Sequence, residues 1–278
     1  MKNKKKCQVI IVTHNNEKHM QWVMDGLNQS NSDIDIFILD SGSSDTSYLD
    51  NLIVKKPIKI KKEGNVGFVK GNNMQLDCIG EYEWTLFLNP DARIDGIDLD
   101  NLLRDLSADE YSNVGIVSIP LTRFDIDKKL SLGTVDSMGI KCNWYGKWYD
   151  IGSGEPVEIE RKDKFISVEA VCGAFLLIRN RLLTEIKDRN GVIGFDSSYF
   201  MYKEDIELCQ RISKHGFGVI VLNKYHAFHC RGWKKRSSIQ HWAKKYSAIN
   251  DLDLAFRYKK RALPYALIKY IWVNLFEK

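Results

Sequence analysis

Short runs of β-branched and other apolar residues alternate with helically periodic segments through about the first hundred positions of the chain. This alternation is typical of a parallel sheet whose strands are connected by crossover helices. The expected strands are 9–12, 34–39, 58–60 and 84–88, and the expected helices are 16–28, 44–53 and 68–79. The pattern therefore predicts an α/β, nucleotide-binding-like half.

The pattern changes from about residue 114, where strand-like runs mix with aromatic and glycine residues. We expect a loop or hairpin at 143–154. The other expected elements are strands at 167–178 and 219–222 and helices at 181–187, 204–215, 238–258 and 263–276, with a break where Pro264 lies. Because no linker is long enough to separate domains, the chain should fold as one unit or as two closely fused halves.

The composition excludes several classes of protein. The 278 residues are 44% hydrophobic and include only 5 prolines, which excludes disordered, collagen-like and low-complexity chains. The longest nearly apolar stretch, 263–276, contains Lys269 and Asn274 and is shorter than the roughly 18–20 residues of a spanning helix. Six well-separated cysteines lack zinc or redox spacing, and the apolar run 7–12 is too short for a signal peptide. We expect a cytosolic protein with reduced thiols.

Polar clusters follow three of the expected strands, and ligands of α/β sheets bind beyond the carboxyl ends of the strands. These clusters are Thr13-His14-Asn15, the Asp-Ser-Gly-Ser-Ser-Asp segment 40–45, and Asn89-Pro90-Asp91. Segment 40–45 does not begin an EF-hand loop, because Asp45 and Asn51 occupy the places of the required Gly and Glu. It is a turn that caps the next helix, and its carboxylate can at the same time accept hydrogen bonds from a base or ribose.

Two further motifs suit a phosphate-bearing ligand. The single carboxylate of Asp91 suits a hard divalent cation that takes its other ligands from diphosphate and water, although such turns are also purely structural. The Gly- and Asn-rich segment 64–73 opens a helix, where backbone N–H groups can meet an anion. Its alternative is a tight turn and a helix that packs closely through Gly71.

Charged and imidazole side chains mark the second half. Glu204, Asp205 and Glu207 begin a helix, where the helix dipole alone favours negative charge. Alternatively, one of them is a general base that takes a proton from an incoming hydroxyl. His226 and His229 follow a strand and are either ordinary packed or surface residues or contacts to metal or phosphate.

Taken in order, these motifs resemble the family 2 glycosyltransferases with a GT-A fold, particularly their rhamnosyltransferase-like subgroup, over about residues 9–250. The motifs are Val-Thr-His-Asn (12–15), Leu-Asp-Ser-Gly-Ser-Ser-Asp (39–45), Asn-Val-Gly-Phe (65–68) with Gly-Asn-Asn (71–73), Leu-Asn-Pro-Asp (88–91), Cys-Gly-Ala-Phe-Leu-Leu-Ile-Arg (172–179), Phe-Met-Tyr-Lys-Glu-Asp (200–205) and His229. The resemblance implies a GT-A catalytic domain at 1–230 around a mixed central sheet. Its nucleotide-sugar half would be about 1–110 and its acceptor half 111–230, followed by a C-terminal helical extension at 231–278.

The resemblance also implies roles for individual residues. The nucleotide sugar would be bound by Thr13, Asn15, Asp40, Asn65, Gly67, Asn72 and Asn89. Asp91 and His229 would hold Mg²⁺ or Mn²⁺, and Gly173, Ala174 and Glu204 would line the sugar or acceptor cleft. Asp205 would be the catalytic base of a single inverting displacement. The implied donor is a nucleotide-diphosphate sugar carrying rhamnose or a similar hexose. The implied acceptor is a glycan or polyprenyl-diphosphate-linked hydroxyl in bacterial surface polysaccharide synthesis.

Three positions depart from the family pattern. His14 stands where a Tyr is usual, and Asn89 stands where many relatives carry an acid, which leaves Asp91 as the one acidic metal ligand. Such a site implies water-rich metal binding. Ile249-Asn250 stands where the subgroup often has Arg-Asn, which weakens the case for an acceptor role of that helix.

Positive charge is concentrated at the C-terminal end: residues 224–278 have a net charge of +10, which leaves −5 for the rest of a chain whose total is +5. Combined with an apolar end, this favours an anionic lipid surface over nucleic acid. The basic residues expected at the lipid are Lys234, Lys235, Arg236, Lys244, Lys245, Arg257, Lys259, Lys260 and Arg261. The residues expected to insert are Tyr265, Leu267, Ile268, Ile271, Trp272 and Phe276. The alternative is a solvated helix face with an ordinary core stripe.

The expected location is therefore cytoplasmic and peripheral at the inner face of the cytoplasmic membrane, with no nucleic-acid partner. Two other functions stay open. One is a catalytically silent membrane-surface binding module on the same fold. The other is a sugar nucleotidyltransferase, which would normally carry a Gly-rich, basic loop directly after the first strand, whereas residues 13–16 are Thr-His-Asn-Asn.

Overall fold

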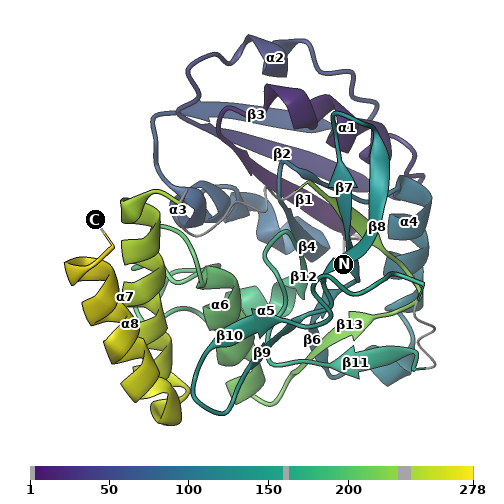
Figure 1. The fold of residues 1–278 in the computed structure, drawn as a ribbon. Coiled ribbons are helices and arrows are strands. Elements are labelled where there is room, and N and C mark those ends of the chain that lie inside the picture. Colours follow the sequence, from purple (N-terminus) through teal and green to yellow (C-terminus); the bar gives the residue numbers. More distant parts are fainter. Residues whose placement is uncertain (1–3, 159–162, 231–238, 278) are drawn as a thin grey trace.

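The computed structural model describes residues 4–158, 163–230 and 239–277, and within them a mixed sheet of eight strands forms the centre of the molecule (Figure 1). The strand order is β11-β13-β6-β12-β4-β1-β2-β3. The strands are β1 (Lys5–Thr13), β2 (Ile34–Ser41), β3 (Ile58–Glu63), β4 (Tyr82–Leu88), β6 (Val114–Ser118), β11 (Phe165–Ser167), β12 (Phe175–Arg179) and β13 (Gly218–Leu222). The strands β1 to β4 run parallel, whereas β12 is antiparallel to both β4 and β6. The predicted α/β class with a mixed central sheet is confirmed.

Helices cover both faces of this sheet. One face packs against α1 (Glu17–Leu27), α2 (Ser47–Asp50) and α4 (Gly96–Asp105), and the other against α3 (Phe68–Asn73), α5 (Asn180–Glu185) and α6 (Glu204–Lys214). The side chains of a strand alternate between the two faces, so Ile11 joins the first core and its neighbour Ile10 joins the second. Both are fully buried, which accounts for the near-continuous apolar runs that the sequence shows at these strands.

Two smaller sheets lie beside the central one. The first has the order β5-β14-β7-β8, and the second is a β9–β10 hairpin at the place where the sequence predicted a loop or hairpin. The strands are β5 (Ala92–Arg93), β7 (Leu121–Asp125), β8 (Leu130–Ser137), β9 (Ile140–Cys142), β10 (Trp148–Asp150) and β14 (Ala227–His229). The pairing of β14 with β5 puts His229 opposite Ala92, directly after Asp91. This small sheet therefore brings two candidate metal ligands together.

The chain ends in two helices, α7 (His241–Arg257) and α8 (Leu263–Leu275), which lie side by side next to α6 (Figure 1). Pro264 lies in the first turn of α8, where its missing N–H costs no helical hydrogen bond. The small side chains of Ala255, Ala262 and Ala266 pack between the two helices. The expected start of the first helix at 238 falls outside the described residues. Within the described ranges, no helix combines the length and apolar character needed to cross a bilayer.

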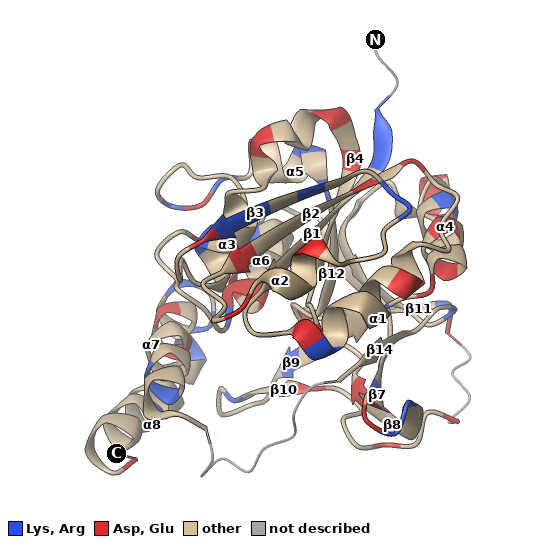
Figure 2. Cartoon of the chain, turned by 90° about the horizontal axis from the view of Figure 1, so that it is seen from above, with Lys and Arg blue, Asp and Glu red and all other residues tan. Residues whose placement is uncertain are grey.

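Several of the basic residues expected to face lipid have protein partners instead. Figure 2 shows acidic and basic residues together on α7. Arg257 forms an ion pair with the buried carboxylate of Glu207 at 2.9 Å, so the expectation that this guanidinium faces lipid is wrong. Lys244 pairs with Glu277 and Lys259 with Glu169, at 3.1 and 2.8 Å. The expected contacts from Lys234, Lys235 and Arg236 fall outside the described residues.

The sequence overestimated the length of three elements. The predicted strand 167–178 is two strands, β11 and β12, because the chain between them leaves the sheet and turns toward α6. The predicted helix 68–79 is α3 followed by the 3₁₀ helix η1 (Leu76–Glu81), since Asn72 and Asn73 have low helix propensity. The predicted helix 44–53 shortens to α2, because its polar start forms a turn.

Candidate active site

The parallel strands β1 and β2 end side by side at two of the predicted donor-binding residues. Thr13 and Asp40 are direct partners in the register of these strands, and both are buried. Tyr48 of α2 contacts both: its Oη lies 3.0 Å from Thr13 Oγ1 and donates to Asp40 Oδ2 at 3.4 Å. One phenol therefore links the two strand ends.

The turn after β2 is held by its own side chains. Asp40 Oδ1 accepts a hydrogen bond from the Ser43 backbone N–H at 2.9 Å, and Asp45 accepts one from the Ser47 N–H at 2.8 Å, at the start of α2. The turn interpretation of segment 40–45 is thus confirmed, whereas Thr46, the N-cap residue of α2, makes no side-chain capping hydrogen bond. Asn15, with a φ of 51°, accepts a hydrogen bond from the Ser44 N–H at 2.8 Å and fixes the loop after β1 against this turn.

The Gly-rich segment lies against both the turn after β2 and the segment before α6. The Asn65 side chain accepts a hydrogen bond from the Gly67 N–H at 3.2 Å. Gly67 has a φ of 78°, and a Cβ at this position would lie 2.4 Å from the ring of Phe200. The Val69 N–H also donates to the Phe200 carbonyl at 3.2 Å. Only glycine fits position 67, because both the backbone conformation and the aromatic ring exclude a side chain.

Asn72 has a different environment from the other predicted donor residues. Its side chain is 1% exposed and donates to the Phe68 carbonyl at 2.9 Å, within the same helix. The neighbouring Gly71 lets α3 approach the sheet, since a Cβ there would lie 3.0 Å from the Val12 side chain. The close-packing alternative for this segment is therefore confirmed at Gly71, and the amide of Asn72 is used inside α3.

The Asn-Pro-Asp turn meets a buried histidine. His229 Nε2 lies 3.4 Å from Asp91 Oδ1, and His229 Nδ1 lies 2.7 Å from Asp136 Oδ2 at the end of β8. The Cys230 N–H donates to the Asp91 carbonyl at 2.8 Å, which ties this turn to the end of β14. His226, in contrast, is exposed and stacks edge-on against the ring of Phe228.

The two carboxylates control the charge of His229. Burial alone would lower the pKa of this imidazole, but its bonds to Asp136 and Asp91 outweigh burial and raise the pKa to about 9. Burial likewise opposes the ionisation of Asp91, yet His229, together with His19, holds the pKa of Asp91 below its ordinary value. The cluster therefore contains an imidazolium between two carboxylates at neutral pH.

The predicted base lies at the start of α6 and is oriented by two backbone N–H groups. Asp205 Oδ2 accepts from the Gly173 N–H and Oδ1 from the Ile206 N–H, each at 2.8 Å. Burial raises the pKa of Asp205 above its ordinary value. Burial, and then the charge of Asp205, raises the pKa of the neighbouring Glu204 to about 8. At neutral pH Glu204 therefore keeps its proton and Asp205 is the carboxylate that ionises first.

The two-residue segment Gly173-Ala174 connects the base to the Asn-Pro-Asp turn. Gly173 donates to Asp205, and the Ala174 carbonyl accepts from the Asn89 N–H at 3.0 Å. A Cβ on Gly173 would lie 3.3 Å from Asp205, so a side chain at this position would press against the base. The segment Gly173-Ala174 therefore connects the candidate base, Asp205, to the turn that carries Asp91.

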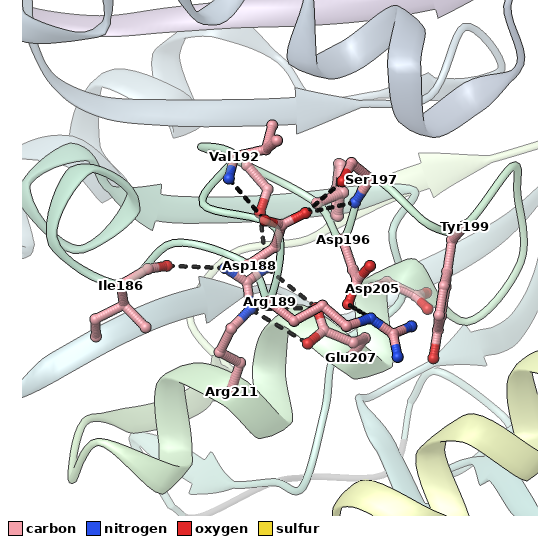
Figure 3. Close-up of polar contacts among 12 residues, drawn as sticks. Ile186, Asp188, Arg189, Val192, Asp196, Ser197, Tyr199, Asp205, Glu207 and Arg211 are labelled. Carbon is pink, nitrogen blue, oxygen red and sulfur yellow. Dashed lines mark hydrogen bonds and ion pairs between the residues drawn. The ribbon is translucent and has the colours of Figure 1, made fainter.

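Buried charges anchor the helix that carries the base. Arg211 of α6 donates to the Ile186 carbonyl at 2.8 Å and forms an ion pair with Glu207, also on α6, as Figure 3 shows. Arg257 of α7 reaches the same Glu207 at 2.9 Å and Asp196 at 2.7 Å. Both carboxylates are fully buried, and each is paired with a guanidinium. Three separate segments are thus fixed around the helix of Asp205.

Known proteins resemble this chain in sequence and in fold. No family model matches the chain. The chain is 25% identical over 241 residues to the rhamnosyltransferase WbbL of Escherichia coli (strain K12), and the match covers 82% of this chain and 85% of WbbL.

Solved structures share the fold. GalNAc-T7 with UDP, GalNAc and Mn²⁺ superimposes with a TM-score of 0.66 at 13% identity, over 92% of this chain and 48% of GalNAc-T7. S. aureus TarS (1–349) with UDP-GlcNAc gives a TM-score of 0.58 at 17% identity, over 96% of this chain and 72% of that one. The chain is a glycosyltransferase with the GT-A fold, similar to the family 2 type. The mannosyltransferase PcManGT from Pyrobaculum calidifontis, with GDP-Man and Mn²⁺, gives a TM-score of 0.58 at 14% identity, over 99% of this chain and 71% of PcManGT.

In this glycosyltransferase, the predicted site residues lie at the ends of central strands, at the start of α6 and at the end of β14, whereas the side chain of Asn72 is used inside α3. Two participants were missed from the sequence. Asp136 contacts His229 across 93 residues, and Tyr48 contacts Thr13 across 35 residues. Neither belongs to a recognisable motif. The only sequence signal was chemical type: a carboxylate after one apolar run, and a tyrosine in a helix that follows a predicted donor motif.

The metal-ligating side chains that this glycosyltransferase offers fit a divalent cation whose other ligands come from the substrate and water. Among the described residues, no group of three or more His, Cys, Asp or Glu side chains is arranged to hold a metal ion alone. Asp91 and His229 nevertheless lie within 3.4 Å of each other, and Asp136 fixes the Nδ1 side of the imidazole. When the cation displaces the proton on His229 Nε2, one carboxylate and one imidazole suit a cation that takes its remaining ligands from phosphate oxygens and water.

Proposed function

We propose that this glycosyltransferase moves a rhamnose or similar hexose, with inversion, from a nucleotide-diphosphate sugar to a hydroxyl of a glycan or polyprenyl-diphosphate-linked acceptor. The process it would serve is bacterial surface polysaccharide synthesis. The observation that carries the proposal is the pair of hydrogen bonds at Gly173-Ala174, which hold Asp205 and Asn89 on either side of one short segment. The similarity to a rhamnosyltransferase supports the choice of sugar.

In the proposed reaction, Asp205 accepts the proton of the acceptor hydroxyl. The oxygen forms a bond to the anomeric carbon while the bond from that carbon to the nucleoside diphosphate breaks. Two N–H donors hold the Asp205 carboxylate, so its orientation is set before the acceptor arrives. Glu204 stays protonated beside it and adds no second negative charge to the incoming hydroxyl.

At the donor end, Thr13, Asn15 and Asp40 would receive the base and ribose, with Asn65 and Gly67 beside them. Asp91 and His229 would hold Mg²⁺ or Mn²⁺, which supplies positive charge to the departing diphosphate. Asp136 would keep the imidazole oriented. Asn89 contributes a buried Oδ1 that has no hydrogen-bond partner among the described residues, so it is ready to accept a donor group of the ligand.

A donor panel tests this proposal. UDP-, GDP- and dTDP-sugars are each incubated with the protein with Mn²⁺, with Mg²⁺ and with a chelator, and both thermal stabilisation and nucleoside diphosphate release are measured. We expect one nucleotide to stabilise the protein and to be turned over only with metal. Asp91→Asn should lose the metal-dependent thermal stabilisation and the metal-dependent release of nucleoside diphosphate. The variant Asp127→Asn, at an exposed carboxylate, should behave as the wild type. If no nucleotide sugar stabilises the protein or is turned over, the proposed transferase function is wrong, and a catalytically silent binding module is the better explanation.

We further propose that α8 contacts the membrane that carries a lipid-linked acceptor. Five of the six residues expected to insert are exposed by 43–66%: Leu267, Ile268, Ile271, Trp272 and Phe276. Tyr265 is half-buried and contacts the ring of Tyr145. Together with the +10 charge of 224–278, this exposed apolar face suits an anionic lipid surface.

Vesicle binding tests the membrane contact. The double variant Ile268→Ser with Trp272→Ser should lose most co-sedimentation with phosphatidylglycerol vesicles. Ile53→Ser changes an equally exposed isoleucine, 68% accessible, in the segment after α2 and should not reduce it. Unchanged binding by the double variant contradicts the proposal, as does a loss of self-association in place of a loss of lipid binding.

A further inference from the structure

The segment immediately before the candidate base has an unfavourable backbone. Tyr202 and Lys203 both have a φ of 68°, in the left-handed region that residues with a Cβ rarely adopt. Each such residue is energetically unfavourable, and two in succession are uncommon. Lys203 directly precedes α6, and Asp205 is the second residue of that helix. The direction in which Asp205 enters the site therefore depends on a strained turn that other contacts must maintain.

Asn250 of α7 supplies such contacts. Its side chain is 4% exposed, and its Nδ2 donates to the Met201 carbonyl at 3.0 Å and to the Tyr202 carbonyl at 2.6 Å. An amide NH₂ has two N–H donors, and both are used on successive carbonyls of the turn. Since these carbonyls flank the residue where the left-handed conformation begins, the two bonds stabilise that conformation directly.

The rest of α7 holds α6 in the same place. Asp251, the next residue, lies 3.8 Å from the Lys203 ammonium, and Arg257 pairs with Glu207 one turn into α6. The helix is thus attached to α6 before and after Asp205. These contacts fix where α6 begins, whereas the pair of bonds from Asn250 acts on the turn itself.

We propose that Asn250 is a positioning residue for Asp205: by holding the 201–203 turn in its left-handed conformation, it places the carboxylate against the Gly173 N–H and toward the acceptor hydroxyl. The effect of this positioning on catalysis rests on the proposed function. Its structural part, the placement of Asp205 against Gly173, can be measured without any substrate.

The first measurement is hydrogen exchange at the Gly173 amide, which donates to Asp205 Oδ2. Asn250→Ala should accelerate exchange at Gly173 by about tenfold or more, because its acceptor moves when the turn relaxes. Asp205→Ala gives the exchange rate when the acceptor is removed. Ser247→Ala is the matched control: it lies one turn earlier on α7, contacts Lys269 of α8, and should leave Gly173 protected. If Asn250→Ala does not fold, Asn250→Ser removes the same pair of donors with a smaller loss of polarity.

The second measurement is steady-state kinetics on the donor that the panel selects. Asn250→Ala should lower kcat by about 10- to 100-fold while the KM for the donor stays within about threefold, because displacement of a reacting group by about 1 Å affects the chemical step. A general loss of folding would change both constants and the melting temperature together.

A double-mutant cycle separates positioning from packing. Glycine adopts a φ of 68° without strain, so Tyr202→Gly makes the turn less dependent on Asn250. Asn250→Ala should therefore cost less activity in the Tyr202→Gly background than in the wild type.

The outcomes are distinguishable. Unchanged protection at Gly173 in Asn250→Ala overturns the proposal whatever the donor assays give, and so does faster exchange with an unchanged kcat. Faster exchange in a protein that turns over no donor supports the placement of Asp205 by Asn250 and rejects the proposed function instead.

Discussion

The two ends of the candidate site are stabilised in different ways. At the donor end, Asp40 bonds to Ser43, three residues away, and Thr13 and Asp40 are neighbouring strand ends. At the base end, Asp205 depends on Gly173, 32 residues away, and its helix depends on contacts from α7 about 50 residues away. The donor end therefore follows from the sheet and its turns. The base end makes its contacts only when α7 is in place, so we expect α7 to fold together with the base end as one unit.

The largest expected difference between the ends is in stability. Arg257→Ala should lower the free energy of unfolding by about 3 kcal/mol, the lower end of the range for breaking a buried ion pair, because Arg211 still pairs with Glu207. Lys62→Ala breaks an exposed ion pair with Asp50 near the donor end and should cost about 0–1 kcal/mol. Urea denaturation measures both. Equal costs would remove the proposed distinction between the ends.

The next effect concerns the candidate metal site, which lies between the donor end and the base end. Asp136→Asn should weaken Mn²⁺ binding in the presence of nucleoside diphosphate by about 10- to 100-fold, because the carboxylate that orients the His229 ring is lost. Titration calorimetry measures the affinity directly, and Asp127→Asn serves again as the exposed control. Unchanged affinity would mean that His229 does not approach the metal.

A smaller effect should appear in the pH dependence of stability at the base end. The pKa of Glu204 rises from 4.5 in the unfolded chain to about 8 in the folded one, so the folded state binds the proton more tightly. Stability contributed by this proton is present below pH 4.5 and is lost as pH rises toward 8.

Glu204→Gln cannot ionise and should gain stability relative to the wild type between pH 5 and 8. The gain should be about 1.4 kcal/mol or more, the equivalent of one pKa unit. Urea denaturation at both pH values gives the difference, and the exposed Glu83→Gln should show none. A constant offset between Glu204→Gln and the wild type would show that Glu204 ionises normally.

The smallest effect is expected at the donor end. Tyr48→Phe removes the hydroxyl that links Thr13 and Asp40 and should cost about 1 kcal/mol of stability. Donor binding should weaken to a similar extent, with kcat unchanged, because the base end is untouched. A fall in kcat larger than the change in binding would indicate that the two ends are coupled through α2.

The sequence predicted the parts of the fold that short-range pattern determines. The strands β1 to β4 and the helices α1 and α6 appear within a few residues of their expected places, because their burial follows a regular period. The helix α4 was not predicted, since it begins at glycine, contains four Asp or Asn residues among ten, and exposes Ile97. Strands as short as β5, with two residues, exist only through their tertiary pairing and leave no periodic signal.

The same division applies to the site. The motifs at strand ends marked Thr13, Asp40 and Asp91, because a strand end positions whatever follows it. Asp136 and Asn250 could not be predicted in this way. Their roles appear only when β8 lies beside β7 and when α7 lies beside α6, and no local pattern encodes either arrangement.

The central claim is that one edge of this sheet binds a nucleotide sugar while Asp205 removes the acceptor proton. The most direct test measures donor binding and sugar transfer together in Asp205→Asn. We predict that kcat falls by about 10²- to 10⁴-fold while the donor Kd stays within about threefold of the wild type. Transfer at the wild-type rate by Asp205→Asn, with its metal dependence intact, would contradict the assignment of the base.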